Sequence, residues 1–133
     1  KDGIAYKEYA IADTNEVQSV TTAAAGECDV LYIPTDNTLA SVTETVYNVV
    51  APAKIPVIAG EEGICNGCGV ATLSISYYDL GYATGEMAYE ILAEGADTTT
   101  MDVRYAPNVT KKYNAKICEE LGITVPDDYV AIQ

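Results

Sequence analysis

The spacing of apolar residues changes repeatedly along this chain, and each change predicts a boundary between a strand and a helix. The stretch VLYIPTDNTLASV, residues 30–42, begins with a continuous apolar run, the pattern of a strand buried on both faces of a sheet. From Leu39 to Val50 the apolar residues follow helical spacing instead, and we expect that helix to end before Pro52. The stretch therefore predicts a strand, a PTDN turn and a helix.

The same alternation is present on both sides of this stretch. Asp13 and Glu16 have the spacing of a capping box, and they predict a helix that ends at Gly26. KIPVIAG and VATLSIS, residues 54–60 and 70–76, repeat the strand pattern. The stretch between them, EEGICNGCG, is rich in glycine and predicts a loop.

The second half of the chain predicts two further helices and one strand. Asp79 is expected to cap a long helix that Gly95 ends, and MDVRYAP, residues 101–107, has the pattern of a strand. Tyr113, Ile117 and Leu121 form a helical stripe that ends at Gly122.

Alternating strands and helices predict an α/β fold, a Rossmann-like parallel sheet flanked by helices. The strands of residues 28–34 and 55–60 should be parallel neighbours, because a helix connects them in a right-handed crossover.

Composition excludes several classes of partner. The chain has 133 residues, enough for one domain, with 20 acidic and 7 basic side chains and a net charge of −13. Such a field repels nucleic acid and anionic membranes, so we expect no nucleic-acid partner. No apolar run has the length of a membrane span. The chain begins Lys-Asp-Gly, which we interpret as the start of a processed or excised piece.

The PTDN turn allows two interpretations. In a parallel sheet, ligands bind beyond the carboxyl ends of the strands. There, Asp36 would bind an ammonium, and the N–H groups at the start of the following helix would bind a carboxylate. An amino-acid zwitterion fits both. Alternatively, Thr35, Asp36 and Asn37 are ordinary capping residues, which would only stabilise the helix, by roughly 0.5–2 kcal/mol.

At this point the chain resembles a known family. DVLYIPTDNTLAS, KIPVIAGEEGIC, YYDLGYATGEMAYEILAEG and YNAKICEELGITVP occur in the order expected of substrate-binding proteins of ABC transporters of the tryptophan/tyrosine type. The resemblance covers most of residues 28–126. It implies a type I periplasmic-binding fold of two α/β lobes that close on a small molecule by hinge motion.

The resemblance also implies that much of the protein lies elsewhere. Family members are about twice as long, so residues 1–70 would be most of lobe two without its first strand and helix. Residues 71–133 would be a crossing strand, a lobe-one helix and a return segment. The expected partners are a small amino acid, a membrane permease and the missing N-terminal half, and the expected location is extracytoplasmic. Without that half, we expect an open sheet edge and exposed apolar surface.

Cys65 and Cys68 form a C-x-x-C pair that allows several interpretations. Zinc would need about four ligands, and the chain offers only two distant cysteines and no histidine, so we expect no metal and no cofactor. A thioredoxin-like pair should open a helix, whereas this one is predicted in a loop. A local disulfide or two unpaired thiols fit better.

No serine elbow, histidine base or Walker loop is present, so a binding module fits better than an enzyme. Tyr77 and Tyr78 follow a strand, where a ring either stacks on a ligand or packs beneath the next helix. Glu61 and Glu62 are either solvated loop charges or contacts for a ligand ammonium. A sensory domain of the same fold and a small redox protein remain alternatives. The predicted ligand-binding residues are Thr35, Asp36, Asn37, Glu62, Tyr77 and Tyr78.

Overall fold

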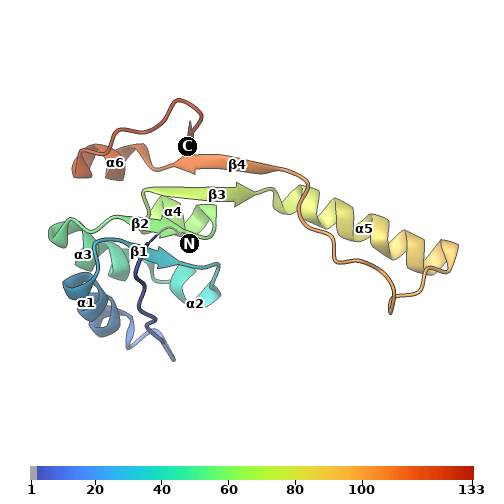
Figure 1. The fold of residues 1–133 in the computed structure, drawn as a ribbon, viewed down its shortest axis with the longest axis horizontal. Coiled ribbons are helices and arrows are strands. Elements are labelled where there is room, and N and C mark those ends of the chain that lie inside the picture. Colours follow the sequence, from blue (N-terminus) through green and yellow to red (C-terminus); the bar gives the residue numbers. More distant parts are fainter. Residues whose placement is uncertain (1–2) are drawn as a thin grey trace.

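The computed structural model describes residues 3–133 and contains a five-stranded sheet in the order β1-β2-β3-β4-β5 (Figure 1). The strands are β1 (Leu31–Ile33), β2 (Val57–Ala59), β3 (Ala71–Ile75), β4 (Val109–Tyr113) and β5 (Val130–Ala131). The helices are α1 (Val17–Glu27), α2 (Asn37–Ala40), α3 (Thr43–Ala53), α4 (Glu62–Cys68), α5 (Tyr77–Glu94) and α6 (Ala115–Leu121).

The predicted α/β fold is confirmed. β1, β2 and β3 are parallel neighbours, joined by helices in the order that the sequence predicts. β4 runs antiparallel to β3, and β5 runs parallel to β4. The sheet is therefore mostly parallel, with one antiparallel pair at the point where the chain returns.

One face of the sheet carries the main core. Ile33, Val57 and Ala59 are buried on this face, against helices α1, α3 and α4. The helices contribute the remaining buried residues of the cluster: Val17, Val46, Val50, Ile64, Cys65 and Cys68. A second, smaller cluster joins Val70 to Ile117 and Cys118 of α6. The tail of the chain therefore packs on the same body as its beginning.

The opposite face and one edge of the sheet are open. Tyr32 and Ile58 are register partners on β1 and β2, and their side chains are 68% and 38% exposed. Leu73 on β3 is also exposed. β1 is the first strand in the sheet order, so no described strand pairs with its outer side. The expected open edge and apolar surface are both present.

Helix α5 and the segment after it form an arm that projects from the body (Figure 1). None of the 18 residues of α5 is buried. Gly95 ends the helix in the left-handed conformation, as predicted, and residues 96–108 return beside it to β4. In residues 3–133, no helix has both the length and the apolar character needed to cross a membrane.

The glycine-rich stretch EEGICNGCG is a helix and not the predicted loop. Glu61 caps α4, with its carboxylate accepting hydrogen bonds from the backbone N–H groups of Gly63 and Ile64. Gly67 lets α4 approach α3, because a Cβ there would lie 2.1 Å from Oγ1 of Thr43. Close packing between helices therefore outweighs the low helix propensity of glycine.

The strand predicted at residues 101–107 is wrong. The side chains of Val103 and Tyr105 are exposed, and the ladder with β3 begins instead at Val109. Residues 101–107 form the return limb of the arm, so they lie outside the sheet.

Several predicted helix boundaries also change. Gly26 lies within α1, which ends at Glu27, and Tyr113 belongs to β4 and not to the last helix. Ser76, not Asp79, caps α5, and its Oγ accepts a hydrogen bond from the Asp79 N–H at 3.1 Å. Asp13 forms a turn with Asn15 and caps nothing; α1 begins after Glu16. The helix predicted from residue 39 is two helices, and α3 continues one residue beyond Pro52.

Candidate functional site

The carboxyl ends of β1, β2 and β3 meet at one edge of the sheet, because these strands are parallel. The segment after β1 carries Thr35, Asp36 and Asn37, the segment after β2 leads to Glu62, and Tyr77 and Tyr78 follow β3. The first two segments touch: Oγ1 of Thr35 donates to the carbonyl oxygen of Gly60 at 3.2 Å. All six predicted site residues therefore follow the carboxyl ends of parallel strands, but β3 continues to Ile75, three residues beyond its pairing with β2, so Tyr77 and Tyr78 lie farther out than the other four.

Gly60 sets the distance between these two segments. Its N–H donates to the carbonyl of Ile33 at 2.7 Å. A Cβ at position 60 would lie 2.6 Å from the backbone nitrogen of Thr35 and 2.8 Å from the carbonyl carbon of Pro34. Glycine is required here because the backbones approach too closely for any side chain.

Asp36 is the N-cap of α2. One carboxylate oxygen, Oδ1, accepts a hydrogen bond from the N–H of Leu39 at 2.8 Å. Thr35, Asp36 and Asn37 are all exposed to solvent at the edge. The capping interpretation of PTDN is thus confirmed, and it leaves Oδ2 of Asp36 directed to no described partner. Capping and ligand binding are compatible at this position.

Glu62 is held by protein groups. Its Oε2 lies 2.6 Å from the ammonium of Lys112 on β4 and accepts a hydrogen bond from Oγ of Ser74 on β3 at 3.1 Å. The hydrogen bond from Lys112 lowers the pKa of the Glu62 carboxyl. Glu62 therefore ties α4 to the pair of strands that leads into and out of the arm.

Tyr77 and Tyr78 open α5 with exposed rings, 61% and 80% accessible to solvent. Neither ring packs beneath the following helix, which was the alternative interpretation. Ser76 fixes the start of this helix, so both rings project from the first turn at the end of β3.

Cys65 and Cys68 lie in α4 with fully buried side chains, and both are free thiols. The predicted loop position of this pair is wrong, because Cys65 and Cys68 belong to the core stripe of a helix. Burial raises the pKa of both thiols to about 12. A redox-active thiol needs a lowered pKa, so these properties are those of apolar core residues.

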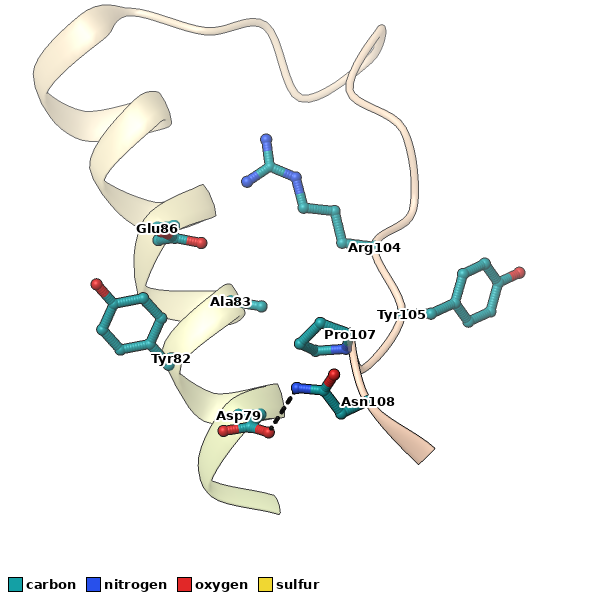
Figure 2. A pocket seen from close by; sticks show the side chains of 8 residues that line it. All are labelled: Asp79, Tyr82, Ala83, Glu86, Arg104, Tyr105, Pro107 and Asn108. Carbon is teal, nitrogen blue, oxygen red and sulfur yellow. Dashed lines mark hydrogen bonds between the residues drawn. The ribbon is translucent and has the colours of Figure 1, made fainter. Parts of the chain in front are cut away.

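A cavity that sequence reasoning did not anticipate lies between α5 and the return limb of the arm. It has a volume of about 390 Å³, and its walls come from residues 79–86 and 104–108. Figure 2 shows the rings of Tyr82 and Tyr105 pointing away from it on opposite sides. Arg104 is already bound to the Glu90 carboxylate, with a shortest contact of 2.6 Å. Only the path of the return limb creates this cavity, so no local pattern signals it.

The chain is similar to proteins of a known family. The model of ABC transporter substrate binding proteins matches residues 1–132. A curated tyrosine-binding protein of Clostridioides difficile is 41% identical over 85 residues, which are 64% of this chain and 25% of that protein.

Three solved structures are similar over nearly the whole chain. A Streptococcus ABC domain in complex with L-Trp has 30% identity and a TM-score of 0.83 over 98% of this chain and 46% of its own. A conserved domain protein of Vibrio cholerae has 31% identity and a TM-score of 0.82 over 98% of this chain and 45% of its own. A ligand-free, open substrate-binding protein with adhesive properties from Clostridium difficile has 36% identity and a TM-score of 0.72, over 99% of this chain and 46% of its own.

The chain thus spans less than half the length of the proteins that it matches. The family model covers it almost from end to end, and the parallel sheet with its open carboxyl edge agrees with that match. The chain belongs to the family of ABC transporter substrate binding proteins.

Proposed function

We propose that the complete receptor binds a small amino acid, with an aromatic side chain, at the carboxyl edge of the β1-β2-β3 sheet. The observation that carries this proposal is the parallel order of these strands, which gathers the segments of Asp36, Glu62 and Tyr77 at one edge. The tyrosine-binding relative and the L-Trp complex support the choice of ligand class.

Each side chain has a role suited to a zwitterion. Asp36 provides an acidic oxygen for the ammonium while its other oxygen caps α2. Thr35 and Asn37 are polar groups on the same turn that hydrogen-bond the ligand. The ring of Tyr77 or Tyr78 stacks on the ligand's ring or receives its ammonium. Glu62 supports the site indirectly, by tying α4 to β3 and β4, because Lys112 already neutralises its charge.

The arm supports a two-lobed receptor. A helix of 18 residues with none buried has no packing partner in the body, so in the complete protein we assign it to the other lobe. Residues 1–70 then belong to lobe two, and β3 crosses to lobe one. β4 returns, and α6 with the tail packs again on lobe two. The antiparallel β3-β4 pair is the connection about which the lobes close.

The role that follows is delivery of the bound amino acid to the membrane permease of an ABC importer, outside the cytoplasm. This role needs no catalysis, cofactor or metal. It also suits the charge of −13, which disfavours nucleic acid as a partner.

Calorimetry on the complete receptor with L-tryptophan and L-tyrosine tests the site. Asp36→Asn retains a side chain that caps a helix as well as aspartate does, but it removes the charge. Loss of a carboxylate that the bound ligand buries and pairs with its ammonium typically costs about 2–5 kcal/mol, so affinity should fall about 30-fold or more. Asp36→Ala should lose the cap as well. If Asp36→Asn binds every amino acid with unchanged affinity, PTDN is only a helix cap.

A further inference from the structure

The antiparallel pair of β3 and β4 leaves the body as a ribbon of two strands (Figure 1). β2 pairs with residues 71–72 of β3, and β5 pairs with residues 112–113 of β4. These residues form the first two rungs of the β3-β4 ladder. In the three outer rungs, residues 73–75 opposite residues 109–111, no described strand lies beside the ribbon. The arm is therefore joined to the body by a stretch of ribbon that the rest of the sheet does not support.

Two adjacent lysines of β4 lie where the supported part of the ribbon ends. Lys112 is opposite Thr72 in the last supported rung, and Lys111 is opposite Leu73 in the first rung beyond it. Adjacent side chains of a strand point to opposite faces of the sheet. The two ammonium groups therefore leave the ribbon on opposite sides, and each of them has partners there.

Lys112 is held on the face that α4 covers. Its ammonium lies 2.6 Å from Oε2 of Glu62, at the start of α4. The same oxygen accepts a hydrogen bond at 3.1 Å from the hydroxyl of Ser74, in the second rung of the unsupported part. Ser74 is only 4% exposed, so α4 covers the ribbon as far as this rung. One carboxylate therefore holds both strands of the ribbon.

Lys111 is held on the opposite face by the tail of the chain. Its ammonium forms an ion pair with the carboxylate of Asp128 and lies 5.7 Å from the centre of the Tyr129 ring. A lysine over an aromatic face gains a further attraction from the ring. Asp128 and Tyr129 directly precede β5. Two elements that are distant in the sequence, the start of α4 and the tail, therefore hold the same short stretch of β4 from its two faces.

We propose that a clamp on Lys111 and Lys112 positions the lobes for ligand binding, because it fixes where the ribbon bends. The two-lysine clamp consists of these lysines and their partners, Glu62, Ser74, Asp128 and Tyr129. It stiffens the base of the ribbon but does not reach the outermost rung, where Val109 is 56% exposed. Lobe closure therefore pivots in residues 75–76 and 108–109. The inference rests on the proposed function, since it takes two lobes that close on an amino acid.

This pivot couples the clamp to affinity without any contact between the clamp lysines and the ligand. Tyr77 follows residues 75–76 directly, so a rotation there changes the distance from its ring to the segment of Asp36. The apparent affinity of a receptor is reduced by the fraction of molecules whose lobes are oriented for binding. A stiff base limits the range of lobe orientations and keeps that fraction high.

Interlobe distances in the complete, ligand-free receptor test the clamp. Spin labels are attached at exposed positions 18 and 98, on α1 and at the tip of the arm, through introduced azido residues that spare the native thiols. The double variant Lys111→Met/Lys112→Met should fold, since exposed ion pairs add little to stability, and should broaden the distance distribution. Lys111→Arg/Lys112→Arg keeps both charges and should restore the narrow distribution. The matched control is Lys54→Met/Lys116→Met, which removes the same charge from exposed positions outside the ribbon and should change nothing.

A merely structural role of the two lysines would lower the melting temperature and leave the distance distribution as narrow as in the wild type, and that result would overturn the proposal. Calorimetry with L-tryptophan gives the second readout: the double methionine variant should bind about 3- to 10-fold more weakly, because fewer molecules are oriented for binding. Unchanged affinity would also overturn the proposal. The distance measurement needs no ligand, so a receptor that binds no amino acid would refute the proposed function while the clamp is still tested.

Discussion

The ammonium of Lys112 on β4 lies 2.6 Å from the carboxylate of Glu62 at the start of α4. Ser74 on β3 donates to the same carboxylate oxygen, so one acidic group joins α4 to both strands of the antiparallel pair. The side chains of Glu62 and Lys112 are 41% and 28% exposed, so solvent screening weakens this ion pair but does not abolish it.

Glu62→Gln should destabilise the complete receptor by at most about 1 kcal/mol at pH 7, since the pair is partly exposed. The folded state lowers the pKa of Glu62 below its ordinary value of 4.5, so the contribution is fully present above that pH. It is lost as pH falls through the folded pKa. Urea midpoints of wild type and variant should therefore converge in acid. A difference that grows below pH 4 would contradict this, and Glu119→Gln on the exposed side of α6 is the control.

Gly60→Ala should destabilise the receptor and also weaken ligand binding, because the new Cβ would lie 2.6 Å from the backbone nitrogen of Thr35 and displace the PTDN turn. Gly26→Ala is the contrasting variant. Position 26 lies within α1 with nothing near its Cβ, so alanine there should stabilise by roughly 0.5–1 kcal/mol. Thermal unfolding and calorimetry of both variants measure the two effects. Tolerance of alanine at position 60 would disprove the close contact.

Tyr78→Leu and Tyr77→Leu report on the ligand's side chain. If one ring stacks on an aromatic ligand, the variant at that position should bind L-tryptophan with a loss of about 1 kcal/mol, roughly 5-fold in affinity, and bind L-leucine almost normally. Tyr89→Leu, further along the exposed face of α5, should change neither affinity. Equal losses for aromatic and aliphatic ligands would mean that the rings only support the helix.

Cys65 and Cys68 should resist alkylation in the native protein. Burial raises the pKa of both thiols to about 12, so they stay protonated at pH 8, and both side chains are inaccessible to solvent. Iodoacetamide labelling followed by mass spectrometry should modify half-buried Cys28 first, and Cys65 and Cys68 only after unfolding. Rapid native labelling of Cys65 or Cys68 would restore the redox interpretation.

Local patterns predicted the parts of this fold that local chemistry determines. The strand, turn and helix around PTDN follow from an apolar run and a capping aspartate, and these elements are present. The strand is not buried on both faces as predicted, because Tyr32 is exposed and only Ile33 is buried. Gly95 and Gly122 end their helices with φ of 72° and 68°, the conformation that glycine favours. The parallel pairing of β1, β2 and β3 could also be predicted from the order of the elements, and the six candidate site residues follow the carboxyl ends of these strands.

The predictions are wrong where contacts between residues distant in the sequence determine the local structure. The glycines in residues 61–69 favour a loop by their low helix propensity. In the structure, Gly67 lets α4 pack closely against Thr43 of α3, and residue spacing alone cannot predict this contact. The pattern of residues 101–107, MDVRYAP, predicts a strand. Pairing with β3 selects Val109–Tyr113 instead, where two lysines make the sequence look like a surface loop.

The main core takes its fully buried residues from a single uninterrupted part of the chain, residues 17–68. That core can assemble during synthesis as soon as α4 has emerged from the ribosome, before the arm exists. β3 can pair with β4 only after the intervening residues 76–108, which form the arm, have been synthesised. Closing a loop of that length costs roughly 3 kcal/mol of chain entropy, and the cost grows only slowly with length. We therefore expect the antiparallel pair to form last, and the arm to tolerate changes in length that the early core would not.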